Sequence, residues 1–404
     1  MRLTSLDHPI SRPPDNVVFL FPDGLPAPTA RSPFFQELGQ RFTTYCWDIR
    51  SLIQKGMPET RYGERVASGV TAIASIDAFR TALRDVDATD TVLVVHLPAV
   101  QYRRNTEAVL REISRRGIDY VILDVANSFG PRKDFNWFRS AANRLKRKSM
   151  LGFRNRRIWF WNDVRPPLFA LVASQIVEDW LRIQGLHTRY VRAHSRDYES
   201  YLQLKREDPG GTETDNVGVF LDQGIGTITS DAILFGEHPR VSFESYCAQV
   251  GAFLRRVIEA QSLDGFRFIL HPSNFTPPDA VKSALKLDPC EVMKGGTAAA
   301  IRRCSVVVSQ SSSALALAVL YEKPIAFFYA DTDDPQASAR PNVTSRYARL
   351  LGRRVNYPDS PNLDVGVDVK RYRKFRLRYV KEPDTIDRSY YRILGDQLSR
   401  VGSD

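Results

Sequence analysis

Residues 217–224 read VGVFLDQG, an apolar run that stops at an acid, an amide and a glycine. Two later stretches repeat this pattern, FRFILHP at 266–272 and VVVSQSSS at 306–313. Short continuous apolar runs are typical of buried strands in a parallel sheet. A helical pattern follows each run, so we predict successive β–α units and an α/β fold.

The polar ends of these three runs are candidates for one ligand site. In open α/β sheets, ligands bind outside the carboxyl ends of the strands. Asp222, His271 and the serines at 309–313 would meet at that edge. Hydroxyl groups and backbone amides suit a phosphate, and a histidine can donate a proton to a departing one. We therefore predict a site for an anionic, phosphate-bearing ligand.

Each of these signals also has a purely structural interpretation. Serines before a helix are common N-caps, and an aspartate beside glycines is a common turn residue. A lone histidine is more often structural than functional. The segment KGGT at 294–297 could contact a nucleotide base or ribose, or could be a simple turn with a threonine cap. Gly224 and Gly226 lack the third glycine of a dinucleotide fingerprint, so no such cofactor is predicted.

Composition and charge restrict the class of protein. A chain of 404 residues with 43% hydrophobic and 25% charged residues is typical of a globular protein with two domains. The net charge of +11 favours an anionic partner, namely a phosphorylated substrate, an acidic membrane surface or nucleic acid. We find neither a signal-peptide pattern nor an apolar run of about 18–20 residues. The four cysteines lack metal-site or redox spacing, so we expect reduced thiols in a cytoplasmic protein.

The order of the patterns along the chain predicts two domains. Strand-like runs at 17–21, 91–96 and 120–124 alternate with helical patterns, as in a parallel α/β domain. The polar segment 207–215 contains Pro-Gly-Gly and reads as a linker. We predict one domain over 1–207, a second over 216–384, and a C-terminal helix at 385–404 that packs back on the first.

The segment 131–157 is strongly basic, with ten basic residues and one acid. Phe135, Phe138, Ala142 and Leu145 recur in it at helical spacing. A cationic helix with aromatic anchors fits the surface of an anionic membrane. It also fits a nucleic-acid face with stacking side chains, or an amphipathic helix packed on its own domain. For contact with a membrane or acceptor, the predicted residues are Trp137, Arg139, Arg144, Lys146, Arg147 and Lys148.

Several motifs between about residues 166 and 381 resemble those of bacterial surface-polysaccharide glycosyltransferases, which build capsule and O-antigen. This GT-B group includes sialyltransferase-like and Kdo-transferase-like enzymes. The similar motifs are VFLDQ at 219–223, His271-Pro272, KGGT at 294–297, Ser311-Ser312 with Lys323-Pro324, HSRDYESYL at 194–202, and the basic, tyrosine-rich segment 370–381. The chain departs from the pattern at Gln223, where related motifs have a second acid, and at Ser309, where many relatives have histidine.

The resemblance implies a GT-B fold, in which two Rossmann-like domains face each other across a cleft. It also implies metal-independent transfer of a sugar from a nucleotide-activated donor to a growing surface glycan or lipid-linked acceptor. A CMP-linked acidic sugar is the favoured donor, and the inner face of the cell membrane the expected location.

The resemblance assigns the role of base to Asp222, and the role of stabilising the leaving phosphate to His271 and the serine cluster. Asp23, after the first predicted strand, is the alternative base. Neither a metal nor a cofactor is predicted. The predicted donor-binding residues are Gln223, Gly224, His271, Pro272, Lys294, Gly295, Thr297, Ser309, Ser311, Ser312 and Ser313.

Two other functions stay open at this point. A CDP-polyol phosphotransferase of the teichoic-acid type shares the His-Pro motif and the serine pair. A non-catalytic protein that binds nucleic acid through the segment 131–157 would explain the charge without an active site.

Overall fold

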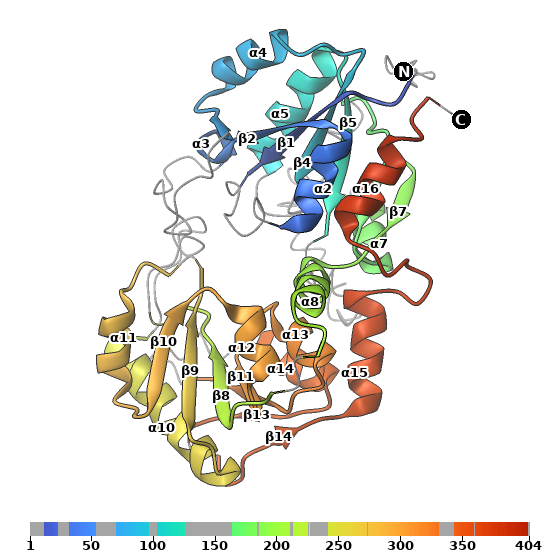
Figure 1. The fold of residues 1–404 in the computed structure, drawn as a ribbon. Coiled ribbons are helices and arrows are strands. Elements are labelled where there is room, and N and C mark those ends of the chain that lie inside the picture. The colour runs from blue at the N-terminus through green and yellow to red at the C-terminus, as the bar shows by residue number, and fades with distance from the viewer. Residues whose placement is uncertain are drawn as a thin grey trace, which may run out of the picture. The chain divides into compact units, whose positions relative to one another are not determined.

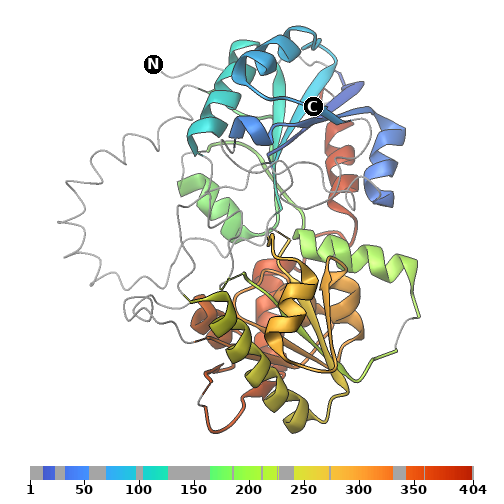
Figure 2. The ribbon, with the colours of Figure 1, turned by 90° about the vertical axis from the view of Figure 1, so that its left-hand side faces the viewer.

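The computed structural model describes residues 12–22, 32–53, 70–96, 103–125, 164–183, 186–210, 213–224, 226, 241–272, 274–330, 343–358 and 360–402. The chain forms two compact units, each built around one sheet with helices on both sides (Figure 1 and Figure 2). The described residues up to Arg196 form the first unit together with the C-terminal segment from Lys381. The residues from Asp197 to Val380 form the second unit.

The first unit contains a seven-stranded parallel sheet in the order β3-β2-β1-β4-β5-β6-β7. The order runs outward in both directions from β1 and β4, which is the arrangement of a Rossmann sheet. Its central strands are fully buried apolar runs. The strands are β1 (Asn16–Phe21), β2 (Thr43–Asp48), β3 (Val70–Ala72), β4 (Thr91–His96), β5 (Asp119–Asp124), β6 (Ala170–Val172) and β7 (Tyr190–Arg192).

Six helices in the described part of the first unit connect or cover these strands. Ser75 caps one of them, α4, by accepting a hydrogen bond from the amide of Ala78. The helices are α2 (Pro33–Arg41), α3 (Arg50–Ile53), α4 (Ile76–Arg84), α5 (Arg103–Arg115), α7 (Gln175–Ile183) and α16 (Tyr390–Leu398).

The C-terminal helix α16 packs against α2, far from it in sequence (Figure 1). The Tyr391 ring lies 5.2 Å from the ring of Phe35, centroid to centroid. Gly395 permits the close approach, because a Cβ there would lie 3.0 Å from a methyl carbon of Leu38. Arg392 adds an ion pair to Glu37 at 2.5 Å. The end of the chain therefore completes the first unit.

The second unit repeats the Rossmann order in the sheet β10-β9-β8-β11-β12-β13, whose strands are parallel. Here the order runs outward from β8 and β11. A last short strand, β14, pairs antiparallel with β12. The strands are β8 (Val217–Leu221), β9 (Gly265–Leu270), β10 (Cys290–Lys294), β11 (Val306–Ser309), β12 (Ile325–Phe328), β13 (Val355–Asn356) and β14 (Val365–Gly366).

The core of the second unit is rich in stacked aromatic rings. Phe220 stacks on Phe268 at 4.8 Å, and Phe253 on Phe328 at 4.4 Å, between centroids. The helices are α8 (Arg196–Glu207), α10 (Phe243–Gln261), α11 (Pro278–Leu285), α12 (Thr297–Arg303), α13 (Leu315–Leu320), α14 (Val343–Leu350) and α15 (Val369–Phe375), which continues as a π-helical turn (Arg376–Val380).

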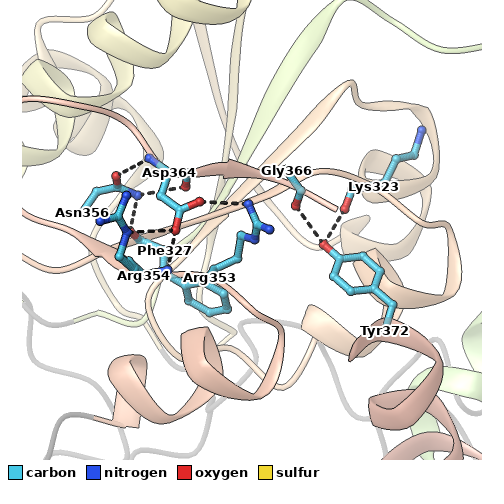
Figure 3. A network of polar contacts seen from close by, with 8 residues as sticks. All are labelled: Lys323, Phe327, Arg353, Arg354, Asn356, Asp364, Gly366 and Tyr372. Carbon is cyan, nitrogen blue, oxygen red and sulfur yellow. Dashed lines mark hydrogen bonds and ion pairs between the residues drawn. The ribbon is translucent and has the colours of Figure 1, made fainter. Parts of the chain in front are cut away.

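A polar network secures the last strands of this unit (Figure 3). Asp364 accepts a hydrogen bond from Arg353 at 2.9 Å, and the Asn356 side chain donates to the backbone of β12 at 2.9 Å. The hydroxyl of Tyr372, on α15, donates to the carbonyl of Lys323 at 2.9 Å. These bonds fasten β14 and α15 to the sheet.

This topology confirms the predicted α/β fold with two Rossmann-like domains, which is the composition that a GT-B fold requires. The three quoted runs form β8, β9 and β11, and β9, β8 and β11 are neighbours in that order. The helical pattern after the third run corresponds to a helix that begins at Leu315. The sequence patterns did not reveal β2, β3, β10, β13 or β14.

Candidate functional site

The carboxyl edge of the second sheet gathers the predicted site residues. Lys294 ends β10, His271 follows β9, Asp222 follows β8 and Ser309 ends β11, and these four strands are consecutive in the sheet. The order of the sheet reverses between β8 and β11. In open α/β sheets the ligand crevice lies at that point.

Asp222 lies at the centre of this edge and is buried, with 3% of its surface exposed. Its Oδ1 accepts hydrogen bonds from the amide of Gly224 at 2.8 Å and the hydroxyl of Tyr246 at 3.0 Å. Its Oδ2 accepts from Asn274 Nδ2 at 3.0 Å and from the amide of His271 at 3.4 Å. A carboxylate can accept about four hydrogen bonds, and these four donors use all of them. This favours a positioning role for Asp222 over the predicted role of base.

Tyr246 on α10 and Gln310 after β11 extend this buried network. The Tyr246 hydroxyl lies 3.0 Å from Asp222 Oδ1 and 3.2 Å from Gln310 Oε1, while Gln310 Nε2 has no partner among the described residues. One hydroxyl hydrogen serves only one acceptor. Turning the Gln310 amide by half a turn lets Nε2 donate to the tyrosine oxygen. Burial and the Asp222 carboxylate raise the pKa of Tyr246, so the phenol stays neutral.

The loop after β9 presents the predicted His271. The amide of Asn274 donates to the carbonyl of His271 at 2.8 Å, and Asn274 Oδ1 accepts from the amide of Thr276 at 2.9 Å. Lys294 Nζ donates to the carbonyl of Asn274 at 3.0 Å, and partial burial lowers the pKa of Lys294. An ordered loop therefore holds His271, which is half-buried, while the neighbouring Pro272 is exposed.

The serine cluster after β11 combines backbone capping with a link to β8. Ser309 Oγ accepts from the amide of Ser312 at 3.3 Å, and Ser312 Oγ accepts from the amide two residues later at 3.2 Å. Ser311 Oγ donates to Gln223 Oε1 at 3.4 Å, and Ser313 is exposed. A hydroxyl that accepts a backbone hydrogen bond still has its own hydrogen to donate. The capping contacts therefore leave the hydroxyl hydrogen of Ser312 able to bind an anion, whereas Ser309 is fully buried.

The turn between β10 and α12 requires its glycines. Gly295 and Gly296 have φ angles of +89° and +67°, a region that glycine enters without steric cost. A Cβ at Gly295 would meet nothing within 4 Å, so the backbone there is open to approach. Gly296 is the N-cap residue of α12 and Thr297 its first helical residue. The alternative of a threonine cap is therefore wrong.

The first unit has a strand-end histidine that the sequence analysis did not select. His96 ends β4 beside β1, where the first sheet reverses its order, and its ring stacks on Phe21 at 5.1 Å. The residue is 8% exposed, and its Nε2 has no partner within the part of the chain that is described. Burial and the charge of Arg196 lower the pKa of His96 to about 3. The strand-end position that selected His271 would also have selected His96.

A metal centre, a disulfide and a membrane span each require features that can be sought among the described residues. Within the described ranges, no three His, Cys, Asp or Glu side chains gather as metal ligands. All four cysteines are buried thiols, and burial raises the pKa of each, for example that of Cys247 to about 12. None of the helices in the described part of the chain has the length and apolar character of a membrane span.

Two groups of predicted residues lie outside the described residues. One is Asp23, the alternative base. The other is the membrane or acceptor set Trp137, Arg139, Arg144, Lys146, Arg147 and Lys148. The roles assigned to them stay predictions.

No protein-family model and no curated protein matches the chain. Among solved structures, it is similar to the UDP-GlcNAc 2-epimerase of Neisseria meningitidis bound to UDP-GlcNAc, with 11% identity, a TM-score of 0.48, and coverage of 95% of this chain and 99% of that one. It is also similar to the UDP-GlcNAc 2-epimerase of Methanocaldococcus jannaschii in complex with UDP-GlcNAc and UDP, with 12% identity, a TM-score of 0.48, and coverage of 95% of this chain and 98% of that one. For a calicheamicin glycosyltransferase the identity is 12% and the TM-score 0.45, with coverage of 97% of this chain and 94% of that one. Similarity at this level assigns neither a family nor an activity.

Proposed function

We propose that the protein is an enzyme that uses a nucleotide-activated sugar and transfers the sugar to a glycan or lipid-linked acceptor. The observation that carries this proposal is the meeting of Lys294, His271 and the serine hydroxyls where the order of the second sheet reverses. Edges of this kind bind nucleotides in Rossmann-like folds. A cation and several hydrogen-bond donors are the groups that stabilise a departing phosphate.

In this proposal the donor phosphates lie against the serine cluster. The hydroxyl of Ser312 donates to a phosphate oxygen, and that of Ser311 does so by giving up its hydrogen bond to Gln223. His271, at the end of β9, donates from the same edge of the sheet, and Lys294 supplies positive charge. The open backbone at Gly295 suits contact with the ribose or base. The other residues proposed to line the donor are Gln223, Gly224, Pro272, Thr297 and Ser313. The buried Ser309, also predicted to bind the donor, instead accepts a hydrogen bond from the amide of Ser312.

The proton acceptor of the reaction is a separate matter. Asp222 is already engaged by four donors, so we propose that it positions the loops of the site. In the sequence, Asp23 is the alternative candidate for the base. Asp23 is therefore the base that we propose.

The favoured donor is a CMP-linked acidic sugar, and the favoured acceptor is a surface glycan or its lipid-linked precursor at an anionic membrane. The motif resemblance at His271-Pro272 and Ser311-Ser312 supports this choice. The same motifs would serve a CDP-polyol phosphotransferase, so the leaving nucleotide alone does not separate the two activities.

Isothermal titration of the purified protein with CMP, CDP and UDP tests the proposed donor site. Lys294→Met should weaken binding of the preferred nucleotide by about 10-fold or more, since a hydrogen bond to a charged group contributes about 1.5–3 kcal/mol. Lys282→Met, at an exposed position of α11, is the matched control and should bind as the wild type does. Unchanged affinity in Lys294→Met would contradict the proposal.

Product analysis by mass spectrometry then separates the activities. Transfer of a sugar supports the proposal, transfer of a polyol phosphate replaces it with the phosphotransferase, and a change of sugar stereochemistry without acceptor indicates an epimerase. His271→Ala and Ser312→Ala should lose turnover while staying folded. Full activity in both variants, or binding of nucleic acid without binding of any nucleotide, would refute the assignment.

A further inference from the structure

The second unit carries a dense band of positive charge that the proposed donor site does not use. Six of the ten residues at 369–378 are basic and none is acidic. They belong to α15 and the π-helical turn that follows it (α15 in Figure 1). We call these residues the cationic stripe: Lys370, Arg371, Arg373, Lys374, Arg376 and Arg378.

The segment is amphipathic, with its aromatic side turned inward. Tyr372, Phe375 and Tyr379 are 3%, 2% and 7% exposed. Figure 3 shows the Tyr372 hydroxyl directed at the carbonyls of Lys323 and Gly366, at 2.9 and 3.4 Å. All of the stripe is exposed except Arg376, which is half-buried. The buried rings therefore hold the segment against the unit, with the basic side chains on its exposed side.

The charge of the stripe is not neutralised by its surroundings. Within the described ranges, none of its six side chains forms an ion pair. The nearest acid in sequence, Asp368, caps α15 by accepting from the amide of Arg371 at 3.0 Å. Asp364 is already paired with Arg353 at 2.9 Å. A surface with this much uncompensated charge attracts a polyanion or an anionic interface.

Two features favour a lipid surface over nucleic acid. Binding of single strands depends on exposed aromatic rings on which bases stack, and the rings of this segment are buried. Val369, the first residue of α15, is instead 65% exposed and offers an aliphatic side chain beside the charges. Exposed aliphatic groups with basic neighbours are typical of helices that lie on anionic bilayers.

We propose that the cationic stripe, with Val369, binds the headgroups of an anionic phospholipid bilayer. This surface is distinct from the segment 131–157 and does not depend on the proposed catalytic function. Each basic side chain near an anionic bilayer contributes about fivefold to binding, or ~1 kcal/mol. The stripe alone is therefore sufficient to hold the protein at a membrane.

Vesicle co-sedimentation of the full chain tests this proposal at about 0.1 M salt, where exposed charges still act at ~10 Å. The wild type should bind vesicles of phosphatidylcholine with phosphatidylserine, and not vesicles of phosphatidylcholine alone. The double variant Lys370→Glu, Lys374→Glu should bind at least about 30-fold more weakly, because two favourable charges are removed and reversed.

The matched control is Lys205→Glu, Lys282→Glu, which makes the same charge change at exposed positions of α8 and α11. It should bind within about threefold of the wild type, because scattered surface charges contribute little. Circular dichroism and urea denaturation establish that both variants are folded.

Three results would overturn the proposal. The first is a wild type that ignores anionic vesicles, and the second is equal binding by the two double variants. The third is stronger binding to duplex or single-stranded nucleic acid than to the vesicles, with the same loss in the stripe variant.

Discussion

Single side chains decide how the carboxyl edge of the second sheet is ordered. Asp222 accepts hydrogen bonds from Tyr246 on α10 and from Asn274 after β9, so one carboxylate joins three segments that are distant in sequence. Hydrogen bonds to a buried charge are among the stronger ones in a protein. The loops that carry the candidate phosphate ligands therefore depend on this residue for their position.

Tyr246→Phe tests this network, because it removes one donor to Asp222 and leaves the buried Gln310 amide without its partner. We expect the free energy of unfolding to fall by about 2 kcal/mol, measured by urea denaturation. Tyr45→Phe is the control, since Tyr45 is 48% exposed, and should change stability by less than about 0.5 kcal/mol. Similar effects of the two changes would argue against a structural network.

The buried His96 predicts that stability depends on pH. Its pKa is about 3 in the folded chain, against about 6.5 for an unfolded histidine. The unfolded state thus binds the extra proton first, and stability falls as the pH drops below about 6.5. Between pH 6.5 and 5 the loss is about 2 kcal/mol. His96→Gln should flatten this part of the curve in urea titrations.

His187→Gln, at an exposed position, should keep the pH dependence of the wild type. Burial also lowers the pKa of His194, which adds a slope of the same sign to every variant. The informative quantity is therefore the difference in slope between His96→Gln and the wild type. A difference of zero would mean that the imidazole is charged, or hydrated, in the folded state.

Among the larger elements, α10 and α11 meet at a contact that permits no side chain. A Cβ on Gly251 of α10 would lie 2.1 Å from the backbone carbonyl oxygen of Leu285. Alanine normally stabilises a helix relative to glycine by up to about 1 kcal/mol. Here we expect Gly251→Ala to destabilise the protein by about 2–3 kcal/mol, because the helices must separate. Urea denaturation measures the change.

Gly210→Ala provides the comparison, because a Cβ there meets nothing within 4 Å. Its effect on the free energy of unfolding should lie within about 0.5 kcal/mol. If Gly251→Ala were as stable as Gly210→Ala, α10 and α11 would be able to move apart with little loss of free energy.

The elements that sequence could predict are those whose signal is local. β8, β9 and β11 are continuous apolar runs because both faces of a central parallel strand are buried. β10 escaped notice because Glu291 interrupts its apolar run and Lys294 ends it, as expected for a partly exposed edge strand. The helix α13 starts after its predicted cap because the hydroxyls of Ser309 and Ser312 hold the intervening amides in turns.

The candidate site likewise contains some residues that the sequence could predict and others that it could not. The strand ends at Asp222 and His271 are visible in sequence, because polar residues follow apolar runs. The contacts of Tyr246 and Gln310 are not, since they arise only when α10 packs beside the sheet. His96 was missed for a different reason, because its strand was predicted without regard to the residue that ends it.

On the scale of the whole molecule, the chain consists of two Rossmann-like units with separate sheets. Two units with separate hydrophobic cores can each unfold with a separate free energy of unfolding. A ligand that binds only the folded second unit stabilises that unit alone. The location of stabilisation therefore reports which unit holds the donor site, independently of any catalytic assay.

Hydrogen exchange with and without the preferred nucleotide makes this measurement. At a concentration 100 times Kd, amides that exchange through unfolding of the second unit should exchange about 100-fold more slowly, a change of ~2.7 kcal/mol. The strands β8, β9 and β11 should show this protection, while β1, β4 and β5 serve as the internal control. Protection centred on β4 would move the nucleotide to the edge that carries His96. Equal protection of both sheets would mean that the two units unfold together, and that the molecule behaves as one cooperative body despite its two cores.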